Sequence, residues 1–406
     1  KYASTVAGYN NALKNLTGQI AGAKRADLVG RRAAREAALN QWLKASEVRA
    51  DDLAAIEAVD ELAIESAAAS REGMAYSRAK ASALVGTAQS LYRLAKEREK
   101  DDAEREKGYQ DRDLPFFRQR MERMERRFDP VVDKALWLNG LAYYYGSDEM
   151  GRFETFHTAM KLPADFDSDA IGGMLDDYYA GTTLMDLDQR VALMEASAAD
   201  LEAMDDPFMQ LAVTLHDHDM KREADEKTRK GQSTALRPAY MRAIIDWQRS
   251  EGKVAYPDAN STLRITYGTV QGGSPRDGMR HEAFTTLEGI VEKDTGEAPF
   301  NAPTAQLDAI KARDHGDYAM EELGSVPVNF MADMDVTGGN SGSATLNARA
   351  ELVGLLFDMT LEAVNSDWDF NPKLSRTIQV DTRYMLWVME QVDGAGHLID
   401  EMQIVR

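Results

Sequence analysis

The sequence has no cysteine, a deficit of basic charge and no long apolar run, and each absence narrows what the chain can do. Without cysteine there are no disulfides, no thiolate metal sites and no cysteine nucleophile. Asp and Glu outnumber Lys and Arg by 68 to 48, which gives a net charge of −20. Phosphate contacts need clustered cations, so this balance argues against nucleic acid and an anionic membrane surface as partners. No apolar stretch is long enough to span a bilayer, and no signal peptide is recognisable.

Proline is also absent before Pro115, and the first 250 residues are rich in Ala, Glu, Leu, Arg and Lys. Apolar residues recur at helical spacing, which predicts long helices with short connections. The charged stretch Lys96–Lys107 is interpreted as a solvated helix face or helix end. We therefore expect a helical bundle domain over residues 1–252. Its later helices are expected at Ala135–Tyr145, Ile171–Tyr179, Leu187–Met204, Phe208–Thr228 and Pro238–Gln248.

The composition changes at Gly252, where Gly and Pro become denser and period-two alternation begins. An antiparallel β domain is predicted over residues 253–406, so the fold class is α+β. It is expected to close with a C-terminal helix that starts at Asp381 and stops at Gly394. The expected strands are Thr262–Tyr267, Val326–Phe330, Leu352–Phe357 and Thr377–Val380, with a hairpin at Leu346–Leu352 and a turn at Gly272–Pro275.

One short stretch, Thr337–Ser343, carries the most chemistry. It reads Thr-Gly-Gly-Asn-Ser-Gly-Ser, so Ser341 stands among small residues in a tight polar turn. Small neighbours let a substrate carbonyl approach the Ser341 hydroxyl, and the N–H groups of Gly339 and Ser341 could face a developing oxyanion. Taken alone, the stretch is equally typical of a β-turn.

Its surroundings favour the catalytic interpretation, because much of the sequence resembles bacterial dipeptidyl-peptidases of the seven/eleven type. The resemblance is dense over residues 255–402 and weaker over the helical region. The matching runs are Tyr256–Asn260, Leu263–Gly268, Phe284–Gly289, Val326–Phe330, Asp335–Ser343, Glu351–Gly354 and Val380–Asp381 with Arg383–Val388.

The resemblance implies a serine exopeptidase with a chymotrypsin-like double β-barrel and an inserted helical domain. Ser341 would be the nucleophile, with the N–H groups of Gly339 and Ser341 as the oxyanion hole. Asp358, seventeen residues after the serine, would bind the substrate's free α-amine together with Asn11 of the first helix, next to Asn10. An ammonium bound by a carboxylate and an amide fixes the peptide's N-terminus, and so fixes which bond reaches the serine.

Several positions depart from the family pattern. Met359 stands where family members that accept apolar substrate side chains have Gly, and where those that accept acidic side chains have Arg. Methionine would limit the size of the S1 pocket but has no charge to pair with an acidic side chain. The resemblance also places Thr360 where Asn is usual, Ala344 where Pro is usual, and Met334 where a small polar residue is usual.

The catalytic base is the larger gap. In the family the His and Asp come from a first barrel that precedes the helical insertion, and that barrel is missing from this chain. None of the six His residues matches its motif, and His281 is expected in a surface turn. We therefore expect these 406 residues to be catalytically incomplete, with an upstream segment before Lys1. The resemblance further implies oligopeptide substrates, a homodimer, no cofactor, and a periplasmic or secreted location in a Gram-negative bacterium.

Two other motifs have simpler interpretations than metal sites. His216-Asp217-His218-Asp219 looks metal-binding, but residues two apart on a helix face different ways. Asp165–Asp169 lacks the glycine and glutamate of a calcium loop, and is interpreted as a helix N-cap cluster before Ala170. No metal site is predicted.

Two alternatives to the peptidase remain open. The departures near Ser341 and the missing barrel are compatible with a non-catalytic relative that binds peptides through their free N-terminal amine. The run Gly-Asn-Ser-Gly-Ser also resembles chymotrypsin-fold glutamyl endopeptidases, although the large helical region disfavours them.

Overall fold

The computed structural model describes residues 3–45, 50–149, 153–255 and 262–405. The chain forms two compact units, each treated separately below. The first unit consists of Ala38–Ala255 together with Lys1–Ser4. The second combines Thr5–Ala37 with Tyr256–Arg406. The contacts thus group the N-terminal segment Thr5–Ala37 with the half of the chain that contains the strands. The division into domains 1–252 and 253–406 stays a prediction.

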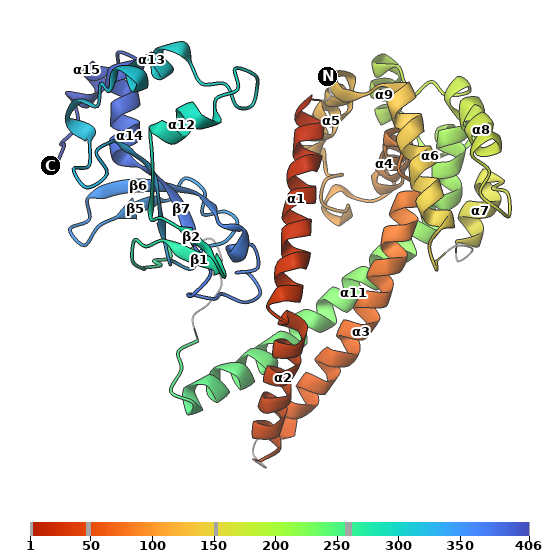
Figure 1. Cartoon of the computed structure of the whole chain (residues 1–406). Helices are drawn as coiled ribbons and strands as arrows, with labels where there is room; N and C mark the ends of the chain where they lie inside the picture. Colours follow the sequence, from red (N-terminus) through yellow and green to blue (C-terminus); the bar gives the residue numbers. More distant parts are fainter. Residues whose placement is uncertain (1–2, 46–49, 150–152, 256–261, 406) are drawn as a thin grey trace. The chain divides into compact units, whose positions relative to one another are not determined.

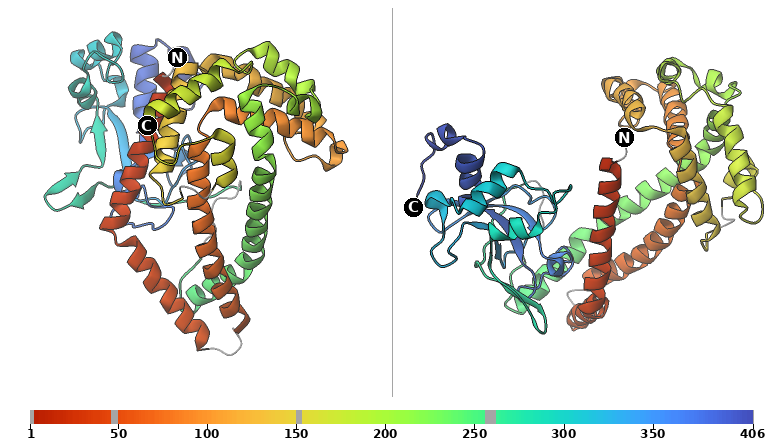
Figure 2. Two further views of the ribbon diagram at one scale, coloured as in Figure 1. Left: turned by 90° about the vertical axis from the view of Figure 1, so that its right-hand side faces the viewer. Right: turned by 45° about the horizontal axis from the view of Figure 1, so that its top comes forward.

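The first unit is helical, as predicted. Its long helices α3 and α11 run side by side in every view (Figures 1 and 2). The helices of this unit are α3 (Ala50–Ala79), α4 (Ala83–Arg98), α5 (Leu114–Arg127), α6 (Pro130–Tyr145), α7 (Glu154–Met160), α8 (Ser168–Ala180), α9 (Leu187–Ala192), α10 (Ala198–Glu202) and α11 (Pro207–Ser250), and α2 (Leu28–Lys44) reaches into it.

Capping side chains set the start of several helices. Asp167 Oδ1 accepts from the N–H groups of Asp169 and Ala170, each at 3.0 Å, so the predicted N-cap before Ala170 is confirmed. Ser82, Asp129 and Asp206 cap α4, α6 and α11 in the same way. Each cap satisfies backbone donors that a helix start leaves without an intrahelical partner.

The core of this unit centres on fully buried Trp137, as expected for the apolar helix around it. Its indole Nε1–H donates to the carbonyl of Ala79 at 2.8 Å, and the ring of Phe208 lies 5.4 Å away. A smaller cluster packs Leu43 and Ile56 against Trp247.

Two helix predictions need correction, and a third is confirmed in part. The expected helix Leu187–Met204 is interrupted, because Ser197 forms a capping box with Asp200 that starts the new helix α10. The expected break before Pro238 does not occur, and α11 runs through it. Packing of Ala243 and Trp247 into the smaller cluster compensates the hydrogen bond that proline removes. In the charged stretch α4 does end at Arg98, but Glu97 is 1% exposed and pairs with Arg93.

The second unit contains an antiparallel five-stranded sheet in the order β3-β4-β7-β6-β5. The predicted strand near Val326, the hairpin, the strand from Leu352 and the strand from Thr377 are all confirmed. The strands are β1 (Gly273–Arg276), β2 (Met279–His281), β3 (Phe284–Thr286), β4 (Pro327–Ala332), β5 (Ala344–Leu346), β6 (Leu352–Met359) and β7 (Thr377–Asp381).

Helices cover one end of this sheet (Figure 1). Trp387 of α14 is fully buried with Leu287 and Val326, and its Nε1–H donates to the carbonyl of Asp314 at 2.6 Å. The predicted terminal helix starts after its N-cap Asp381 and ends before Gly394, whose φ is +62°. The helices of this unit are α1 (Ala3–Arg25), α12 (Glu288–Lys293), α13 (Thr304–Ala312), α14 (Thr382–Trp387) and α15 (Gly396–Ile399).

Two strand-region predictions are wrong, and the barrel is not shown. Thr262–Tyr267 alternates like a strand, but it belongs to none of the strands that the structure describes, and its apolar side chains are 84–91% exposed. Gly272–Pro275, expected as a turn, runs into β1, which pairs with β2. The mixed helical and antiparallel class is confirmed. Among the described strands β3 and β5 are edge strands, so no closed barrel is seen. The matched run Tyr256–Asn260 lies outside the described residues.

Candidate functional site

The serine-bearing loop, residues 337–343, is a tight turn that needs its glycines. Gly339 and Gly342 have φ values of +97° and +88°, which side chains with a Cβ rarely adopt. The Asn340 side chain accepts from the N–H of Thr337 at 3.1 Å, and its carbonyl accepts from Ser343 at 2.9 Å. Ser341 stands exposed between these anchors.

Two backbone hydrogen bonds tie this loop to β6. The N–H of Gly342 donates to the carbonyl of Leu356 at 2.7 Å, and the N–H of Leu356 donates to Ser343 at 3.0 Å. Ser341 is therefore held next to the strand that carries Asp358 and Met359.

A β-bulge sets the direction of those two side chains. Leu356 pairs with Gln379 of β7, but the next pair is Asp358 with Ile378, so Phe357 is the extra residue. A bulge shifts which side chains face which side of a sheet. It brings Met359 opposite Thr377, whose side chain is buried.

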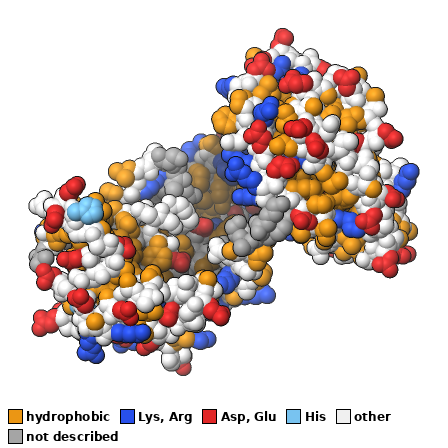
Figure 3. All heavy atoms as spheres, turned by 90° about the horizontal axis from the view of Figure 1, so that it is seen from above, with side chains coloured by type: hydrophobic (Ala, Val, Ile, Leu, Met, Phe, Trp, Pro, Cys, Tyr) orange, Lys and Arg blue, Asp and Glu red, His pale blue; other side chains and the backbone are white. Residues whose placement is uncertain are grey.

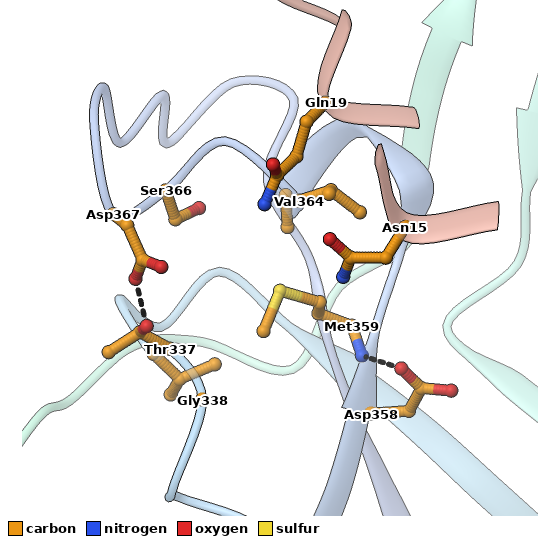
Figure 4. A pocket seen from close by; sticks show the side chains of 11 residues that line it. Asn15, Gln19, Thr337, Gly338, Asp358, Met359, Val364, Ser366 and Asp367 are labelled. Carbon is orange, nitrogen blue, oxygen red and sulfur yellow. Dashed lines mark hydrogen bonds between the residues drawn. The ribbon is translucent and has the colours of Figure 1, made fainter. Parts of the chain in front are cut away.

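Asp358 and Met359 line a pocket of about 230 Å³ (Figure 4). The serine-bearing loop contributes Thr337 and Gly338, while Ser341 and Gly339 do not line it. The full lining is Asn15, Gln19, Val336, Thr337, Gly338, Asp358, Met359, Ala363, Val364, Ser366 and Asp367. Two of the predicted site residues thus meet in one pocket beside the serine loop.

Helix α1 contributes Asn15 to the pocket, not the predicted Asn11. Asn11 lies one turn earlier and is exposed. Residues four apart lie on the same helix face, so Asn15 offers the same amide chemistry one turn further along. The sequence does contain this signal, because Asn15 closes the run Tyr9–Asn15.

The segment after β6, residues 360–369, attaches α1 and the first turn of α2 to this unit. Asp369 forms a two-bond ion pair with Arg31 at 2.6 and 3.0 Å, and the Asn365 amide donates to the carbonyl of Gln19 at 3.2 Å. The helix comes close because it has glycines there: a Cβ at Gly18 would lie 2.6 Å from Leu361 Cδ1. These contacts hold Asn15 in place.

The pocket is acidic. Asp358 accepts from the N–H of Met359 at 2.8 Å, and Asp367 accepts from the Thr337 hydroxyl. Among the described residues, neither carboxylate has a Lys or Arg partner. No cation lines the pocket either.

The histidines lie elsewhere. None of the six lines the pocket, and His281 ends β2 instead of lying in the predicted surface turn. His216 and His218 pack against the rings of Tyr92 and Tyr76, at 5.0 and 5.1 Å. Within the described ranges no group of three acidic or histidine side chains is placed to hold a metal ion. In the same ranges, no helix combines the length and apolarity needed to cross a membrane.

Comparison with known proteins gives consistent matches over the whole chain. The profile of the Peptidase S46 family matches residues 1–404. An Asp/Glu-specific dipeptidyl-peptidase from Shewanella putrefaciens is 41% identical over 427 aligned positions, which cover 100% of this chain and 58% of the relative. A dipeptidyl-peptidase 7 from Capnocytophaga gingivalis is 38% identical over 211 positions, covering 50% of this chain and 28% of the relative.

A solved structure agrees with these matches. The crystal structure of Porphyromonas endodontalis DPP11 in complex with the dipeptide Arg-Glu superposes with a TM-score of 0.74 at 25% identity. The match covers 98% of this chain and 56% of that chain. The chain therefore spans little more than half the length of the Shewanella putrefaciens relative and of the DPP11 chain.

Proposed function

Since the chain belongs to the peptidase S46 family, we propose that it is part of a serine dipeptidyl-peptidase that removes dipeptides from the N-termini of oligopeptides. The observation that carries the proposal is one pocket, in which Asp358 and Asn15 lie beside the loop that presents Ser341. An acidic pocket next to an exposed serine suits a substrate whose free ammonium must be fixed at a set distance from the bond that is cut.

In this proposal Ser341 Oγ attacks the carbonyl carbon of the second residue. Its proton passes to a general base, and the C–N bond breaks as the leaving amine takes that proton. The dipeptide is left as an acyl-enzyme, which water then hydrolyses. The N–H groups of Gly339 and Ser341 stabilise the oxyanion in both halves of the reaction.

Asp358 is proposed to pair with the α-ammonium, with an amide of α1 as its second partner. The sequence suggested Asn11, but Asn15 is the amide that lines the pocket. Met359 is proposed to form a wall of the S1 pocket, where its flexible thioether limits the size of the substrate side chain.

The general base is proposed to come from polypeptide beyond these 406 residues. The part of the Shewanella putrefaciens relative that the chain does not match leaves room for it. By the same resemblance we propose that the five-stranded sheet belongs to a chymotrypsin-like barrel, that the helical unit acts as a cap, and that the protein is a periplasmic or secreted homodimer.

A pair of substrates with and without a free amine tests the recognition step. With the protein in its natural length, Asp358→Asn should lower kcat/KM for dipeptidyl substrates about tenfold or more, because a charge-assisted contact is lost. N-acetylated substrates should stay uncleaved by both proteins. Equal cleavage of acetylated and free substrates would refute the proposal, and saturable binding of free-amine peptides without turnover would favour the non-catalytic alternative.

A further inference from the structure

The carboxylates around the pocket fall into two groups. Outside the lining, Glu362 lies 3.6 Å from Arg25 and Asp369 lies 2.6 Å from Arg31, so each pairs with an arginine of the N-terminal helices. Inside it, Asp358 and Asp367 have no Lys or Arg partner among the described residues. The unit thus has cations nearby, but they neutralise the carboxylates outside the pocket.

Under the proposed function, only one of the two lining carboxylates has a role. Asp358 takes the α-ammonium, and Asp367 then remains as a second anion in the same pocket. Asp367 also contacts the first residue of the serine-bearing loop, because it accepts a hydrogen bond from the hydroxyl of Thr337. A carboxylate has about four lone-pair positions, so one hydroxyl leaves room for a cationic donor.

The wall between the two carboxylates is apolar. In Figure 4 the Met359 side chain lies between Asp358 on one side and Thr337 with Asp367 on the other. Val336, Ala363 and Val364 complete the apolar part of the lining. Lys and Arg side chains match this lining, because their aliphatic stems pack against apolar surface while the charged head can pair with a carboxylate.

We propose that Asp367 is a specificity-determining residue that selects peptides with Lys or Arg as the second residue. The inference rests on the proposed function. Asp358 holds the α-ammonium, Met359 contacts the aliphatic stem of the second side chain, and Asp367 pairs with its cationic head. An acidic second residue would instead meet two carboxylates and no cation, which disfavours it by like-charge repulsion. The chain would then differ from its Asp/Glu-specific relatives.

The test is a substrate panel on the protein in its natural length. Free-amine dipeptidyl fluorogenic amides with Arg, Lys, Leu or Glu as the second residue are compared by kcat/KM. We expect Arg and Lys to be cleaved about fivefold better than Leu, as an ion pair of about 1 kcal/mol gives. Glu is expected to be the poorest substrate.

Variants separate specificity from structure. Asp367→Asn should lower kcat/KM for Arg and Lys about fivefold and leave Leu unchanged, and Asp367→Glu should restore part of the preference. Asp277→Asn, on the exposed turn between β1 and β2, removes the same charge outside the pocket and should change nothing.

The outcomes distinguish the two proposals. Cleavage of Leu substrates without any preference for Arg or Lys, or an equal loss on all substrates in Asp367→Asn, overturns the inference alone. Cleavage of none of the four overturns the proposed function and the inference with it.

Discussion

At the scale of single residues, the site depends on which side chains reach the pocket. Asp358 and Met359 were predicted by resemblance and do line one pocket. Asn11 was predicted on the same basis, yet Asn15 is the one that lines it. The sequence could not show which of the two reaches the pocket, because the position of α1 along the segment 361–369 depends on contacts between residues more than 300 positions apart, such as Asn365 with Gln19.

His218 offers a residue-scale prediction about pH. Burial lowers its pKa below the ordinary 6.5, with the nearby Arg222 and Lys80 acting in the same direction and Asp219 opposing them. Its Nε2 has no hydrogen-bond partner among the described residues. The unfolded chain, whose His218 pKa is higher, therefore binds more protons between the two values. The free energy of unfolding should fall as pH is lowered through about 6.5.

Urea unfolding at pH 8.0 and 5.5 checks this effect. His218→Gln should show a smaller loss of stability between the two pH values than the parent, since it cannot be protonated. His397→Gln is the matched control, because His397 is exposed. The buried carboxylate of Glu97 does not mask the result, since burial raises its pKa but Lys100, the Glu106 N–H and Arg93 outweigh that effect and hold the pKa at about 2. An unchanged pH dependence in His218→Gln would show that protonation of His218 does not lower the stability.

At the scale of elements, the alternation of apolar residues predicted a strand correctly where the fold buries those residues. This holds for β4 and β6, which each pair with β7 and bury apolar side chains. Thr262–Tyr267 has the same alternation but lies outside the described strands, and its apolar side chains are exposed. Pro238 shows the converse, since tertiary packing keeps α11 helical through a residue that usually ends a helix.

Two helix glycines in the first unit give an element-scale prediction. A Cβ at Gly140 of α6 would lie 2.2 Å from the carbonyl oxygen of Arg78 in α3, whereas a Cβ at Gly86 of α4 meets nothing within 4 Å. Gly140→Ala should lower the free energy of unfolding by about 2 kcal/mol through overpacking. Gly86→Ala should raise it by about 0.5 kcal/mol through helix propensity.

Urea denaturation of the two variants measures the difference, and each serves as the control of the other. If Gly140→Ala were as stable as Gly86→Ala, α3 and α6 would not pack as closely at Gly140 as the structure shows.

At the scale of the whole molecule, the two compact units have separate cores. On the face drawn in Figure 3, Asp and Glu side chains are scattered among Lys and Arg instead of forming one patch. The two compact units are built on different clusters of buried residues. The grouping of Thr5–Ala37 with the second unit could not be read from the sequence, because it depends on long-range contacts.

Each unit contains one fully buried tryptophan whose indole donates a hydrogen bond, Trp137 in the first and Trp387 in the second. Trp137→Phe and Trp387→Phe should each cost about 2 kcal/mol, since volume and a hydrogen bond are lost. We expect each variant to destabilise chiefly its own unit, as hydrogen exchange resolved by peptide would show. Equal loss of protection in both units for either variant would contradict separate cores.

The central claim is that Ser341 is the nucleophile of a dipeptidyl-peptidase. The most direct measurement is mass spectrometry of the protein in its natural length after reaction with a fluorophosphonate, together with its rate on free-amine dipeptidyl substrates. We expect a single adduct on Ser341 in the parent protein. In Ser341→Ala we expect no adduct and at least about a thousandfold loss of rate. An adduct on another residue, or equal cleavage by the parent and Ser341→Ala, would contradict the central claim.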